Sequence, residues 1–128
     1  MPQYMLLIYT PAEGGPSQEE RAAEMPRWFE YTESLRDAGI MVSGDALHGV
    51  DSATTVRVRS GETQITDGPF AETKELLGGY YIVDVPDLDT ALAHAARMPN
   101  VHYGSIEVRP VVDFSQTAMS QTQAQASA

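Results

Sequence analysis

Carboxylates and histidines that could move protons gather at two places in the sequence. Asp45 and His48 are three residues apart, and Asp67 opens the segment Asp-Gly-Pro-Phe-Ala-Glu-Thr-Lys-Glu. A carboxylate buried beside another carboxylate can have its pKa tuned for proton transfer, and a histidine near an acid can act as an oriented base. We therefore take Asp67, Asp45 and His48 as candidate catalytic residues.

Each of these candidates also has a purely structural interpretation. Asp-Gly-Pro at 67–69 is typical of a turn, with Phe70 then anchoring the loop in the core or at a subunit interface. A loop histidine such as His48 is commonly just solvated. The sequence leaves both interpretations open.

Arginines form a candidate ligand-binding group. Arg57 and Arg59 share one face of an alternating run, and Arg109 shares a face with Glu107 in a second such run. Guanidinium groups bind a carboxylate or an enolate-like oxyanion in bidentate fashion. The alternative is cross-strand Arg–Glu pairing that satisfies a buried dimer face.

Further polar residues are candidates for ligand binding. Lys74 is the sole lysine among 18 acidic residues and could bind an anion or bridge two subunits, although a solvated ion-pair loop explains it as well. His102 and Tyr103 precede the last expected strand and could donate to a ligand, or belong to an ordinary loop in which Tyr103 is packed. The histidines lack metal-ligand spacing and cysteine is absent, so we predict no metal.

Hydrophobic periodicity and turn residues predict the elements that must position these side chains. A strand is expected over 4–9, and a helix begins at the capping box of Ser17 and Glu20, with a kink or restart at Pro26. Its apolar stripe closes at a C-terminal glycine and consists of Trp28, Phe29, Thr32, Leu35 and Ala38. The remaining expected elements are a strand over 40–48 with a bulge or close approach at Gly44, a hairpin over 54–66, a strand over 79–85, a helix from Asp87 to Pro99, and a strand over 105–111.

This order predicts an α+β, ferredoxin-like split βαβ fold with an extra β-hairpin, whose antiparallel sheet carries both helices on one face. If the helices cover Val56, Val58, Ile106 and Val108, the arginines lie on the open face. That face would expose much apolar surface, so we expect a second copy to cover it. The homodimer would enclose a polar lumen.

The segment 67–75 resembles the signature of the YCII-related proteins of the DGPF-motif branch. Five further blocks carry the resemblance, which covers nearly all of residues 3–114: Tyr4–Tyr9, Gly44–Leu47, Thr54–Arg59, Gly78–Tyr81 and Gly104–Pro110. The resemblance implies a dimeric α+β barrel. Family members are often neighbours or fusion partners of sigma-factor-like genes, and a distant branch carries a His-Asp pair proposed as catalytic. Asp45 stands where glutamate is common in the family.

Composition limits the remaining possibilities. A chain of 128 residues with 42% hydrophobic residues predicts one domain, over 1–114, followed by an uncharged disordered tail over 115–128. The net charge of −10 argues against direct nucleic-acid binding and against anionic membranes. Without a signal peptide or a spanning segment, we expect a cytoplasmic protein.

Two functional hypotheses remain. In the first, a dimeric barrel binds a small polar or aromatic metabolite and is an acid/base enzyme that needs no tightly bound cofactor. Asp67 or Asp45 would move a proton while the arginines hold an oxyanion. In the second, the same polar face only specifies dimerisation in a non-catalytic regulatory or protein-interaction module, linked to sigma-factor-type transcription control.

Overall fold

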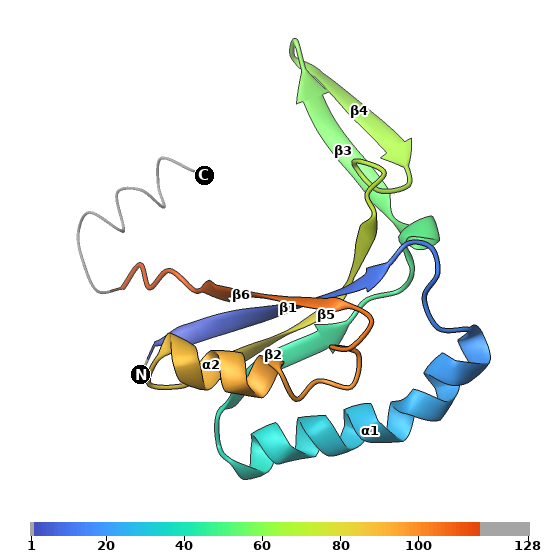
Figure 1. Ribbon diagram of the computed structural model, residues 1–128. Helices are drawn as coiled ribbons and strands as arrows, with labels where there is room; N and C mark the ends of the chain where they lie inside the picture. Colours follow the sequence, from blue (N-terminus) through green and yellow to red (C-terminus); the bar gives the residue numbers. More distant parts are fainter. Residues whose placement is uncertain (1, 116–128) are drawn as a thin grey trace.

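The computed structural model describes residues 2–115, which form one α+β unit (Figure 1). The elements follow in the order β1 (Gln3–Pro11), α1 (Gln18–Asp37), β2 (Met41–Ala46), the short 3-10 helix η1 (Val50–Ser52), β3 (Thr54–Arg59), β4 (Glu62–Asp67), β5 (Glu75–Asp84), α2 (Leu88–Ala95) and β6 (Ser105–Pro110).

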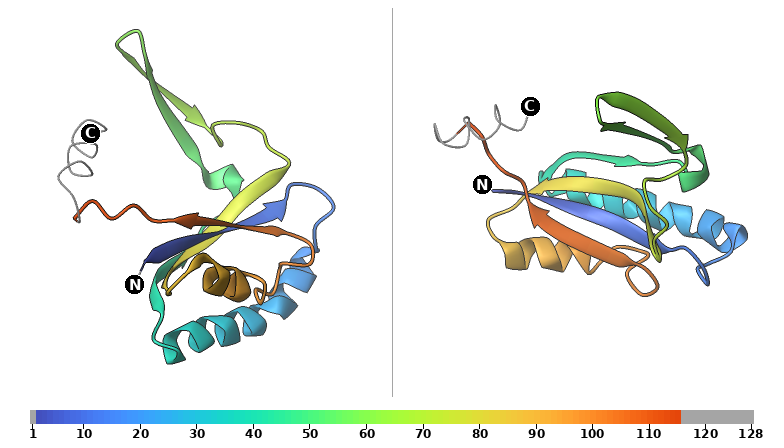
Figure 2. Two further views of the ribbon diagram at one scale, coloured as in Figure 1. Left: turned by 60° about the vertical axis from the view of Figure 1, so that its left-hand side comes forward. Right: turned by 90° about the horizontal axis from the view of Figure 1, so that it is seen from above.

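Four strands form one antiparallel sheet in the order β2-β5-β1-β6, and Figure 2 shows both helices on the same side of it. The apolar run of β1 occupies a central position, paired with β5 on one side and β6 on the other. This arrangement confirms the predicted ferredoxin-like fold with an antiparallel sheet and an extra hairpin.

The core lies between the sheet and the helices. Alternate residues of the central strands point to the helices, as Leu6 and Val83 do, and Tyr31 and Leu35 of α1 meet them there. Ile106 and Val108 of β6 pack against the same cluster, as predicted. Period-2 alternation in the strands therefore selects which side chains the helices cover.

Both ends of α1 follow the sequence signals. The Ser17 side chain accepts from the Glu20 amide, and the Glu20 carboxylate accepts from the Ser17 amide, each over 3.1 Å. At the other end Gly39 has φ +72°, and the amides of Gly39 and Ile40 donate to the carbonyls of Arg36 and Leu35 in a Schellman motif. The helix continues through Pro26, so the expected restart there is wrong.

The predicted apolar stripe of α1 proves to be two adjacent stripes. Leu35 is fully buried and lies beside Tyr31, which the prediction omitted, whereas Phe29 is 65% exposed. Apolar residues at spacings of three and four cannot distinguish a covered side chain from one that borders a pocket, because both point toward the sheet.

The hairpin β3–β4 requires a correction to the predicted sheet. It forms its own two-stranded sheet and projects beyond the other four strands (Figure 1). Val56 and Val58 are 61% and 58% exposed, so the expectation that the helices cover them is wrong. The alternation of β3 was correctly recognised, but alternation does not identify the partner that a strand face packs against.

Residues 116–128, which hold nearly all of the predicted tail, lie outside the described residues. Among residues 2–115, neither helix has the length and apolar character needed to cross a membrane.

Candidate functional site

A pocket of about 780 Å³ lies between α1 and the sheet, where β1 and β2 end and β5 begins. One side of α1 forms one wall, and the loop after β2 and the segment between α2 and β6 close the others. Exposed apolar side chains give the lining its character, among them Met25, Phe29, Leu47 and Leu77. A concave, mostly apolar site of this size with a few polar groups is typical of small-molecule binding.

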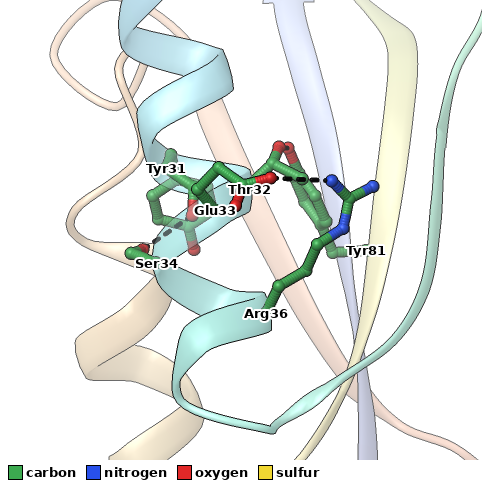
Figure 3. A network of polar contacts seen from close by, with 6 residues as sticks. All are labelled: Tyr31, Thr32, Glu33, Ser34, Arg36 and Tyr81. Carbon is green, nitrogen blue, oxygen red and sulfur yellow. Dashed lines mark hydrogen bonds and ion pairs between the residues drawn. The ribbon is translucent and has the colours of Figure 1, made fainter.

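A pair of hydroxyls lies where the pocket meets the core. Thr32 Oγ1 and the Tyr81 phenol oxygen are 2.6 Å apart. Figure 3 draws both residues with their neighbours on α1. The Tyr81 ring meets the Tyr31 ring edge-on with centroids 5.5 Å apart. The core therefore fixes Tyr81, while Thr32 remains at the pocket wall.

At the edge of the pocket, β2 lies close to β5, and the Asp45 side chain lies beside Tyr80 on the sheet face opposite Tyr81. A Cβ on Gly79 would lie 2.8 Å from the Asp45 carbonyl oxygen, and one on Gly44 would lie 2.7 Å from the Tyr81 ring. These approaches confirm the close contact predicted at Gly44 and explain why both positions hold glycine. The Tyr80 hydroxyl donates to Asp45 Oδ2 over 2.7 Å, and this hydrogen bond raises the pKa of Tyr80.

Glu24 organises a second polar group on the pocket wall. Its carboxylate accepts from the Trp28 indole over 2.8 Å and from the Tyr103 hydroxyl over 2.8 and 3.0 Å. Burial first, and the hydrogen bond to Glu24 second, raise the pKa of Tyr103 to about 12. Tyr103 therefore stays a neutral donor at physiological pH.

Asn100 contributes to the same wall and is 1% exposed. Its side-chain amide donates to the Tyr9 backbone carbonyl over 3.3 Å, and the backbone carbonyl of Asn100 accepts from the backbone amides of Tyr103 and Gly104. A Cβ on Gly104 would clash with the Tyr9 carbonyl, so glycine is required there. Within residues 2–115, no donor meets Asn100 Oδ1.

Of the candidates chosen from the sequence, Asp45, His48 and Tyr103 line this pocket. The remaining six lie elsewhere, and they are Asp67, Arg57, Arg59, Arg109, Lys74 and His102. His102 is exposed and stacks edge-on against Tyr103. Lys74 borders a separate hollow with Tyr9 and Glu107.

A single chain does not bring the three arginines together. Arg57 Nη2 donates to the Phe70 carbonyl over 2.6 Å, and Arg59 donates to the carbonyl of Val58, both on the hairpin side. Arg109 lies on β6 opposite Met5, on the sheet face that the helices leave open. The hairpin's departure from the main sheet is the physical reason for this separation.

The segment around Asp67 behaves as a turn within the chain. Gly68 has φ +104°, its amide donates to the Ala53 carbonyl over 2.7 Å, and its carbonyl accepts from Thr55 over 2.8 Å. Phe70 is 73% exposed, so it does not anchor the loop in the core of its own chain.

Sequence reasoning missed Glu24 and Asn100, whereas it named Tyr103 together with His102 as a possible donor to a ligand. Glu24 and Trp28 are four residues apart on one helix, a spacing that brings two side chains together, so this contact was open to prediction. Asn100 and Tyr103 join them only because the segment after α2 folds back beside β1, and no local pattern encodes that return.

The fold defines a ferredoxin-like α+β domain, and its pocket has the size typical of small-molecule sites. The model of the YCII-related domain matches residues 2–115, so the chain belongs to the YCII-related family. The chain is also similar to an uncharacterized protein of Rhizobium meliloti (strain 1021), with 50% identity over 97 residues that cover 74% of this chain and 78% of the relative.

Proposed function

We propose that this protein binds a small, largely apolar or aromatic metabolite in the pocket between α1 and the sheet, and that His48 exchanges a proton with it. The observation that carries the proposal is the 780 Å³ pocket itself, a concave and mostly apolar site whose lining includes His48. Of the two acid candidates, Asp67 lies outside the lining, and the Asp45 carboxylate points with Tyr80 to the helix-free face of the sheet.

His48 is the residue that supports an acid/base role. It follows the end of β2 and lines the pocket, and an imidazole can act as a general acid or a general base. The arginines proposed from the sequence as oxyanion holders would join this function only if a second copy brought them to the site.

We propose a homodimer as the functional form. Two apolar surfaces support it: the helix-free sheet face with Met5, Leu7 and Ile82, and the hairpin face with Val56 and Ile65, which pair across β3 and β4. Exposed apolar area of this extent on a small domain is typical of a subunit interface. Phe70 would then meet the partner rather than its own core.

We also place the chain in the DGPF-motif branch of the family, because residues 67–75 carry the motif in full. The alternative function is a non-catalytic regulatory module linked to sigma-factor-type control. It predicts that the protein binds another protein through the open face and that the pocket stays without a specific ligand.

The test is a ligand screen in which the fluorescence of 8-anilinonaphthalene-1-sulfonate, a dye of apolar pockets, reports occupancy. Metabolites that displace the dye and raise the melting temperature would identify the ligand class. His48→Gln should abolish turnover while leaving the melting temperature nearly unchanged, and His102→Gln, outside the pocket lining, is the matched control. Equal loss of activity in both variants, or no dye binding at all, would contradict the proposal.

The dimer has its own test in solution mass measurements. Ile65→Glu adds a charge to the hairpin face and should shift the mass from dimer to monomer. Leu92→Glu, on α2, changes an exposed apolar residue on the helix side and should leave the dimer intact. A wild-type protein that is monomeric would overturn the dimer but not the pocket.

A further inference from the structure

The wall of the pocket formed by α1 and the segment after α2 holds hydrogen-bond acceptors in excess of donors. Asn100 Oδ1 is fully buried, and within residues 2–115 no hydrogen bond reaches it. A buried acceptor without a donor is costly, by about 1 to 3 kcal/mol, so native proteins retain one where something else satisfies it. The alternative amide orientation would place Oδ1 against the Tyr9 carbonyl, so the orientation with Nδ2 donating to Tyr9 is fixed by its neighbour.

Glu24 is the second acceptor, and it carries a charge. Its two hydrogen-bond donors, Trp28 and Tyr103, are both neutral, and in the described part of the chain Glu24 forms no ion pair. The side chain is half-buried on the pocket wall. A carboxylate in this setting gains most from a ligand that is both a donor and a cation.

Tyr103 connects the two acceptors. Its backbone amide donates to the Asn100 carbonyl over 3.2 Å, and its hydroxyl donates to Glu24 over 2.8 Å. Asn100 and Glu24 therefore lie within the span of one tyrosine. Because Oδ1 is closed to solvent, a ligand reaches it only when the side chains that cover it move, which couples binding to a movement of the pocket wall.

We propose that this pocket, if it binds a metabolite as set out above, selects a primary amine on an apolar or aromatic body. The ammonium group would lie between Glu24 and Asn100, with its N–H groups donating to the carboxylate and to Oδ1, and the apolar body would lie along Met25, Phe29 and Leu77. The net charge of −10 adds a general attraction for a cation. Arg21 also lines the pocket and is the residue that an anionic ligand would use instead.

The test compares three probes that share a phenyl ring: 2-phenylethylamine, 2-phenylethanol and phenylacetate. Trp28 is the single tryptophan and lies on the pocket wall, so its fluorescence reports binding directly, and calorimetry gives the affinities. The amine should bind about tenfold more tightly than the alcohol, as expected for a charge-assisted hydrogen bond, and more tightly still than the carboxylate.

Two variants separate the roles of the acceptors. Glu24→Gln keeps an acceptor for Trp28 and Tyr103 but should remove the preference for the amine over the alcohol. Glu30→Gln removes an equal charge from an exposed position of α1 outside the lining and should preserve it. Asn100→Ser should weaken both the amine and the alcohol, and its melting temperature shows whether it remains folded.

The outcomes distinguish this inference from the proposed function. If all three probes bind equally and Glu24→Gln changes nothing, amine selection is wrong and the pocket remains a site for apolar ligands. If phenylacetate binds best, the site takes anions and the inference is overturned. If neither the probes nor the dye bind, both proposals fail.

Discussion

Helix α1 presents two adjacent stripes to the sheet, and they differ in what they meet. The stripe with Tyr31 and Leu35 packs on Leu6 and Tyr81 without leaving space. The stripe with Met25, Phe29 and Thr32 faces the pocket. Both belong to one helix with one set of caps, so helix formation does not depend on filling the second stripe. The first stripe stabilises the fold and the second leaves room for a ligand.

The largest expected difference is in stability. Leu35→Ala should lower the free energy of unfolding by about 3 kcal/mol, because it removes apolar contacts and leaves a cavity in a site that is completely closed. Phe29→Ala, the matched change on the other stripe, should cost less than about 1 kcal/mol because the ring is largely exposed. Urea unfolding of both variants measures the difference. Equal losses would show that the pocket stripe is structural.

The next effect on stability concerns the close approach of β2 to β5 beside the pocket. Gly79→Ala should cost about 2 kcal/mol, because the new Cβ would meet the backbone of Asp45 and push β2 away from β5. Gly78→Ala is the control, since a Cβ there has only the Ile8 carbonyl nearby, at 3.9 Å. Thermal unfolding compares the two. If Gly79→Ala is neutral, the close approach does not hold Asp45 in place.

A smaller change in the free energy of unfolding is expected at the Thr32–Tyr81 contact, which lies between the two stripes. Tyr81→Phe removes the hydrogen bond with Thr32 and should cost about 1 kcal/mol. Thr32→Val should cost a similar amount, and the double variant should cost little more than either change alone. Additive losses in urea unfolding would show that the two hydroxyls contribute independently.

The sequence predicted the elements well because their signals are local. The capping box at Ser17, the Schellman glycine at Gly39 and the alternation in β1 and β6 each operate within a few residues, and the structure contains all of them. The element order then predicted the topology. Here local propensity and tertiary packing agree, which is the condition under which sequence reasoning is reliable.

The site was only partly predictable, because it depends on contacts between distant segments. Asp45 and His48 were identified from residue type and spacing, and they do line the pocket. Glu24 was not among the candidates, and only the returning segment with Tyr103 makes it part of a polar cluster. The prediction for Arg57 assumed that all strands belong to one sheet, whereas the hairpin β3–β4 forms a separate two-stranded sheet.

The smallest expected effect is a pH dependence of stability that arises at His94 of α2. Burial first, and the neighbouring Arg97 second, lower the pKa of His94 from its usual 6.5. The unfolded chain therefore binds this proton more readily than the folded protein does, so stability is fully present above pH 6.5 and falls as the pH drops through the lowered pKa. His94 lies next to the core, because its backbone carbonyl accepts a hydrogen bond from Tyr31 over 2.7 Å. Melting temperatures measured between neutral and mildly acidic pH should decline in the wild type and decline less in His94→Gln. Asp87 has a lowered pKa through its hydrogen bonds to Thr90, and it loses its stabilising effect only at more acidic pH, so the two contributions are separable. If the melting temperature of His94→Gln depends on pH as that of the wild type does, protonation of His94 does not contribute to the pH dependence of stability.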